Sequence, residues 1–205
     1  MRSVLMLAAV LRLAPATALA QGPWGNVKSW TGTMTIEATD LDKSETGSSK
    51  MTYRATGEFT IVDDMLPDGS HMQWPMPSVE TLSDPKQAES ANARWQSRVV
   101  ASYDAKGLDE QGGPWSVTCT ADNKQASLVG VTINPTAPTY VMEVEAPQAV
   151  FRCTGATHSA PNGRLRQVHF RLSGPRGEPG PVSGTETFTV ETSKITVTYR
   201  MAPSK

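Results

Sequence analysis

The sequence predicts an all-β protein, an antiparallel β-sandwich or open barrel of about nine strands with one short helix. Threonine, valine and aromatic residues recur at every second position over long stretches, and glycine, proline, asparagine and aspartate separate these stretches. A period of two is typical of strands that bury one face and expose the other. One segment, residues 85–91, instead begins like a helix.

Residues 1–20 have the features of a signal peptide. Arg2 precedes an apolar run over residues 4–11, and small residues lie just before the expected cleavage point after Ala20. The apolar run is much shorter than the roughly 20 residues that a membrane-spanning helix needs. We therefore expect one β-rich domain over residues 21–205 with no transmembrane segment, in the periplasm or outside the cell.

Two long alternating segments open the predicted domain. Trp30, Met34 and Ile36 alternate with threonines, and residues 51–61 follow the same pattern. The polar stretch at 40–49 predicts a turn between them, so we expect an antiparallel pair. The later alternating segments predict strands at residues 95–103, 115–119, 128–133, 140–146, 151–153, 165–172, 185–192 and 194–201.

Residues 63–84 interrupt the alternation with repeated prolines. This stretch is longer than an ordinary connection within a compact domain, so we expect a loop, and long loops often carry function. Asp84 followed by Pro85 is typical of a helix start, with aspartate as the cap and proline in the first turn. We expect this helix to end near Ala91.

The two cysteines, Cys119 and Cys153, predict a disulfide bond. An exported protein meets an oxidising environment, and two cysteines allow a single intramolecular pairing. Trp115 shares the strand phase of Cys119, and Phe151 shares that of Cys153. We therefore expect the disulfide to point into the core beside two aromatic rings.

The charge balance argues against nucleic acid as a partner. The chain has 19 basic and 20 acidic residues, and the signal peptide removes Arg2 and Arg12 but no acid. Binding to phosphates needs a clustered basic surface. Arg164, Arg166 and Arg171 are the nearest approach to one, but strand alternation would place Arg171 on the opposite face.

The predicted long loop holds the most distinctive group of side chains. These candidate binding residues are Met65, His71, Met72, Trp74 and Met76. Thioether and imidazole groups suit copper, so His71, Met72 and Met76 are candidate metal ligands. Methionine is also an adaptable hydrophobic residue, which allows the loop to cover one end of the sheet instead. Trp74 beside a proline is a candidate platform for a sugar ring or a protein partner.

Acidic residues form two further patterns. Asp40, Asp42 and Ser44 have the first three ligand spacings of a calcium loop, but the required glycine and closing acid are absent, so an EF-hand is excluded and a looser calcium contact remains. Glu143 and Glu145 would share one strand face. Outward acids are ordinary on antiparallel sheets, so this pair neither supports nor excludes glycosidase chemistry.

The sequence contains no recognisable catalytic arrangement. It has no G-x-S-x-G motif, and His71, His158 and His169 have no catalytic motif around them. We assign no catalytic residue and expect no cofactor. The leading hypothesis is an exported, non-enzymatic β domain with a binding or structural role and a protein or glycan partner. The alternatives are a hydrolase of an extracytoplasmic polymer, or a copper-handling protein that uses the methionine and histidine loop.

Overall fold

The computed structural model describes residues 29–65, 71–74, 95–133, 139–156, 159–175 and 181–204. Within these ranges the chain forms eleven strands and no α-helix, which confirms the predicted all-β class. The same ranges contain no helix long and apolar enough to cross a membrane. The predicted signal peptide and the predicted helix at 85–91 lie outside the described residues.

All strand pairs are antiparallel, and most strands follow the alternating segments of the sequence. The strands are β1 (Ser29–Lys43), β2 (Gly47–Met65), β3 (His71–Trp74), β4 (Trp95–Leu108), β5 (Pro114–Ala126), β6 (Val129–Ile133), β7 (Thr139–Glu145), β8 (Arg152–Gly155), β9 (His169–Pro175), β10 (Val182–Val190) and β11 (Ser193–Ser204).

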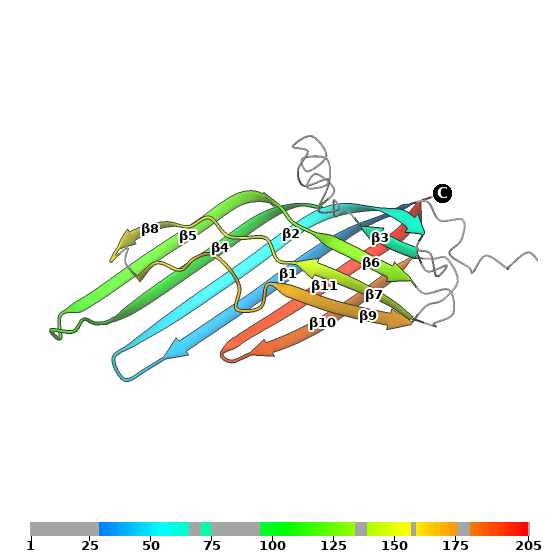
Figure 1. The fold of residues 1–205 in the computed structure, drawn as a ribbon. Helices are drawn as coiled ribbons and strands as arrows, with labels where there is room; N and C mark the ends of the chain where they lie inside the picture. The colour runs from blue at the N-terminus through cyan, green and yellow to red at the C-terminus, as the bar shows by residue number, and fades with distance from the viewer. Residues whose placement is uncertain are drawn as a thin grey trace, which may run out of the picture.

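The strands form two layers because β2 changes its partner along its length. Its first part, Gly47–Phe59, pairs with β4, and its last part, Val62–Met65, pairs with β3. One branch completes a seven-stranded sheet in the order β10-β11-β1-β2-β4-β5-β8. The other branch runs through β3 to β6, β7 and β9, which lie across the large sheet away from the β1–β2 and β4–β5 hairpin ends (Figure 1).

The main hydrophobic core lies between these two layers. Trp30, Ile36 and Ile61 contribute from the large sheet, and Met142 and Leu172 contribute from the second layer; all five are less than 2% exposed. Full burial of an aliphatic side chain stabilises a fold by about 1.5–3 kcal/mol. The pairing of β1 with β2 places Trp30 opposite Ile61, so the predicted antiparallel pair is confirmed.

The two layers approach each other again at β9 and β10, although these strands are not paired through their backbones. The rings of Phe170 and Phe188 lie 5.1 Å apart between centroids. The backbone N–H of Ser173 donates to the carboxylate of Glu186 at 3.2 Å. Side chains therefore connect β9 to β10 where no backbone pairing does, and the structure is a sandwich that is not closed into a barrel.

Glycine and aromatic residues form recurring cross-strand pairs. In four places a glycine lies directly opposite an aromatic residue, and the ring occupies the space that a Cβ atom would need. These pairs are Gly32 with Phe59, Gly107 with Trp115, Gly174 with Tyr140, and Gly184 with Tyr199. Rings laid over glycine in this way shield the backbone and hold the strand register.

Two of these rings also join the layers. The hydroxyl groups of Tyr140 on β7 and Tyr199 on β11 form a buried hydrogen bond of 2.5 Å, and the rings meet edge to face with centroids 6.5 Å apart. Burial is the main reason that the pKa of each phenol is raised, so both keep their protons at neutral pH. One hydroxyl donates and the other accepts.

Replacing these tyrosines tests how strongly this bond joins the layers. We expect Tyr140→Phe and Tyr199→Phe each to lower the free energy of unfolding by about 1–3 kcal/mol, because each leaves one buried hydroxyl without its partner. The double variant should lose less than the sum of the two. Urea unfolding of the four proteins measures the coupling. Strictly additive losses would contradict a direct bond.

Candidate functional site

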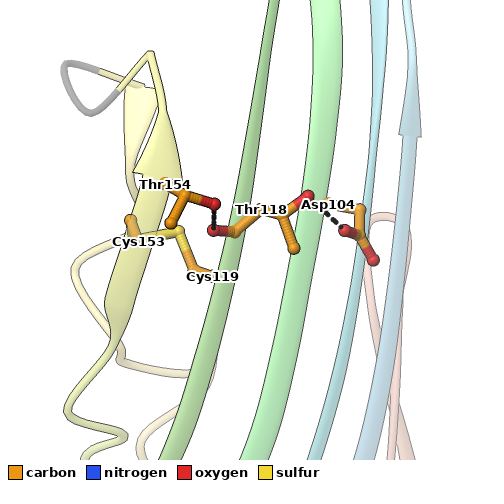
Figure 2. Close-up of a disulfide and its surroundings, with 5 residues drawn as sticks. All are labelled: Asp104, Thr118, Cys119, Cys153 and Thr154. Carbon is orange, nitrogen blue, oxygen red and sulfur yellow. Dashed lines mark hydrogen bonds between the residues drawn. A yellow bond between two sulfur atoms is a disulfide. The ribbon is translucent and has the colours of Figure 1, made fainter.

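The predicted disulfide joins β8 to the edge of the large sheet. Cys119 on β5 and Cys153 on β8 are paired in register with their Cα atoms 4.0 Å apart (Figure 2). On the same strands, Thr154 donates to the carbonyl oxygen of Thr118, whose hydroxyl donates to Asp104 on β4 at 2.9 Å. The disulfide therefore fixes a four-residue edge strand that has few backbone bonds of its own.

The segment before β8 is held by side chains of the large sheet. The buried hydroxyl of Tyr53 donates to the carbonyl oxygen of Pro147 at 2.6 Å. Asn123 on β5 donates to the carbonyl oxygen of Gln148 and accepts from the backbone N–H of Val150. These bonds carry the chain along the exposed edge of β5 and deliver Cys153 to Cys119.

The surroundings of the disulfide agree in part with the sequence. Trp115 and Phe151 do pack beside it, together with Tyr103. These residues form a small hydrophobic cluster with Ala105, Val117 and Cys119, and Tyr103 and Phe151 also pack against the main core. Cys119 is fully buried, so the disulfide points inward beside the two rings as expected, and it lies at the β5–β8 edge of the large sheet.

This cluster borders a shallow hollow of about 220 Å³, which we call the tip groove. The groove lies where the β1–β2 hairpin meets the start of β5. Its lining includes Asp42, Ser49, Tyr103, Ala105, Lys106 and Trp115. Strand alternation puts Ser49, Tyr103 and Trp115 on the inner face of the large sheet, toward the β1–β2 and β4–β5 hairpins. The strands β6, β7 and β9 of the second layer lie toward the other end of that sheet (Figure 1).

Neither Ser49 nor Tyr103 was singled out from the sequence. Both belong to ordinary alternating segments, and the sequence does not say which part of an inner face stays uncovered. The available signal was Gly107, because a glycine inside a strand pattern often marks a place where another group approaches closely. The indole of Trp115 takes that place.

A cluster of charged groups lies beside the groove and reaches its lining at Asp42. Arg166, in the connection before β9, donates to Asp40 at 2.9 Å, forms an ion pair with Glu191, and lies 3.6 Å from the carboxylate of Asp42. Thr192 also donates to Asp40 at 2.6 Å. Partial burial by itself would raise the pKa of Asp40, but the bonds from Thr192 and Arg166 outweigh it and lower the pKa.

This cluster bears on the predicted calcium contact at Asp40, Asp42 and Ser44. The carboxylates of Asp40 and Asp42 face the guanidinium of Arg166, which already supplies the positive charge. Within the described ranges, no three histidine, cysteine or acidic side chains gather in a way that would hold a metal ion. The described geometry therefore favours an internal ion pair at this hairpin.

The predicted loop at 63–84 is partly strand. Met65 pairs with His71 at the end of the β2–β3 ladder, and Met72 and Trp74 also belong to β3. A loop is therefore wrong for residues 63–65 and 71–74, because the backbone at 71–73 also pairs with β6 on its other edge. Met76 lies outside the described residues, and the copper hypothesis stays a prediction from sequence.

Glu143 and Glu145, the acidic pair noted in the sequence, do lie on one face of β7. Glu143 lies opposite Arg171, and Glu145 lies opposite His169, in the register of β7 with β9. They border a hollow of about 260 Å³ on the second layer, whose lining shares no residue with the tip groove. Opposite charges across neighbouring strands are an ordinary way to stabilise a solvent-facing sheet.

The charged cluster predicts a pH dependence of stability. We expect Asp40→Asn to lower the free energy of unfolding at pH 7. Because the pKa of Asp40 is lower in the folded protein, its contribution is present above the unfolded pKa, about 3.9, and is lost as pH falls through the folded value. Urea unfolding of both proteins between about pH 7 and pH 2.5, roughly the range over which carboxylates titrate, measures it. A constant difference would contradict this role.

Comparison of the chain with protein-family models finds no match, and comparisons with curated proteins and with solved structures likewise find none.

Proposed function

We propose that this protein is an exported domain that acts by binding, without catalysis, in the cell envelope or outside the cell. The tip groove is the observation that carries the proposal. It combines two partly exposed aromatic side chains, Tyr103 and Trp115, with polar groups such as Ser49 and Asp42. Concave sites that join aromatic surface to a few placed polar groups are typical of ligand binding.

The construction of the groove supports binding by a rigid surface. Tyr103 and Trp115 come from neighbouring strands of one continuous ladder, and both pack in the cluster that holds the disulfide. A surface ordered before the ligand arrives loses less entropy on binding. The disulfide also suits an oxidising compartment, in agreement with the signal-peptide features of residues 1–20.

The test measures retention and cleavage together. The oxidised mature protein is mixed with the insoluble cell-envelope fraction of the producing organism and centrifuged. We expect the protein to sediment with this fraction, and we expect no soluble fragments above those of a protein-free control. Protein unfolded by urea and reduced serves as the control for non-specific adhesion.

Two results would contradict this proposal. Failure of the folded protein to sediment would remove the binding role in the envelope. Release of soluble fragments that a single substitution abolishes would replace it with the hydrolase alternative.

Disulfide removal gives a further prediction. The bond closes a separation of 34 residues, so its loss should lower the free energy of unfolding by about 3–4 kcal/mol. We expect Cys119→Ala/Cys153→Ala to show this loss in urea unfolding and to be retained less by the envelope fraction, because Tyr103 and Trp115 pack in the cluster that the bond braces. Unchanged retention would separate the groove from the disulfide.

A further inference from the structure

We propose that the tip groove binds a single ring of a saccharide chain, with Tyr103 and Trp115 as stacking surfaces. This inference rests on the binding function proposed above and names its ligand class. Aromatic side chains offer a flat apolar surface beside a polar edge. A pyranose ring has the matching form, because its C–H groups make apolar faces and its hydroxyls lie around the rim.

The position of Trp115 fits a stacking role. Its indole lies over Gly107 on the neighbouring strand, so a built Cβ at Gly107 would lie 2.8 Å from the indole Cζ2 atom. The ring therefore lies along the sheet and not upright in the core. Tyr103 is on the same inner face, where it lines the groove beside Ala105 and packs in the same cluster.

Polar groups surround these rings at the hairpin. Ser49 and Asp42 provide hydrogen-bond acceptors, and the Ser49 hydroxyl also provides a donor, within the lining of one hollow. Arg166 lies 3.6 Å from Asp42, which fixes the carboxylate at the side of the groove. Sugar hydroxyls both donate and accept, so a neutral hydroxyl beside a carboxylate suits them.

The size of the groove also favours one sugar ring. Its volume of about 220 Å³ is below the 300–1,000 Å³ of typical sites for drug-sized ligands. Larger hollows of about 360 and 380 Å³ lie on the outer face of the sheet, where Thr33 and Arg200 line both. The aromatic residues that border them, Tyr199 and Phe59, are at most 3% exposed and cannot stack on a ligand.

The experiment compares substitutions inside the groove, at Ser49 and Tyr103, with one outside it on the opposite face of β2. Ser49→Arg places a long side chain in the groove, whereas Thr56→Arg makes the same change on the exposed outer face of the same strand. Tyr103→Ala removes one stacking surface, and Tyr103→Phe keeps the ring. Thermal unfolding of each full-length mature variant confirms that it is folded before binding is measured.

Calorimetric titration uses three defined probes: chitotetraose, cellotetraose and soluble peptidoglycan glycan strands. We expect the wild-type protein to bind at least one of them. Ser49→Arg and Tyr103→Ala should weaken that binding about tenfold or more, and Tyr103→Phe, which keeps the ring, should bind more tightly than Tyr103→Ala. Thr56→Arg, outside the groove, should stay within about threefold of the wild type. This pattern would place the saccharide in the tip groove.

Other outcomes overturn the inference and separate it from the proposed function. If no probe binds but the protein still sediments with the envelope fraction, the binding function stands and the saccharide assignment is wrong. If a probe binds equally to all folded variants, the saccharide site lies elsewhere. If neither probes nor envelope retain the protein, both proposals are wrong.

Discussion

The change of partner along β2 is the constraint on which the rest of the fold depends. A single sheet with this many strands would leave one wide apolar face in water. Because β2 leaves β4 after Phe59 and takes β3 from Val62, the chain starts a second branch without starting a second domain. That branch covers the apolar half of the large sheet, and the hydroxyl bond between Tyr140 and Tyr199 closes the contact. The strands of this branch do not extend over the β1–β2 and β4–β5 hairpin ends of the large sheet (Figure 1).

The hairpin end, which the strands β6, β7 and β9 do not reach (Figure 1), has its own means of stabilisation. A disulfide, a side-chain network around Arg166 and the bonds of Asn123 replace the broad hydrophobic contact that the second layer provides elsewhere. Such local bonds hold a surface in shape while leaving part of it in contact with water. A binding groove needs this combination, since full burial would exclude the ligand and weak support would make binding costly in entropy.

Alternation in the sequence was sufficient to predict the strand class, the pairing of β1 with β2, and Trp115 as a neighbour of Cys119. The presence of two cysteines in an exported chain predicted their bond. Alternation did not predict which strands distant in the sequence pair with each other. Nothing local in residues 63–74 distinguishes a proline-rich loop from β3, because β3 is defined by its pairing with β2 and β6. The candidate groove was missed for a related reason: Ser49 and Tyr103 become a site only where the covering layer stops, and that point depends on the topology.

The opposed glycine and aromatic positions also limit how this sequence can change over time. A side chain in place of Gly184 meets the ring of Tyr199, and a small residue in place of Tyr199 leaves the backbone of Gly184 bare. Each position is thus tolerant only when its partner changes as well. We therefore expect substitutions at Gly184 and Tyr199 to be coupled, and the same holds for Gly174 with Tyr140. Sequences that diverge within this fold should therefore change both members of a glycine–aromatic pair together, whereas the exposed threonines can change one at a time.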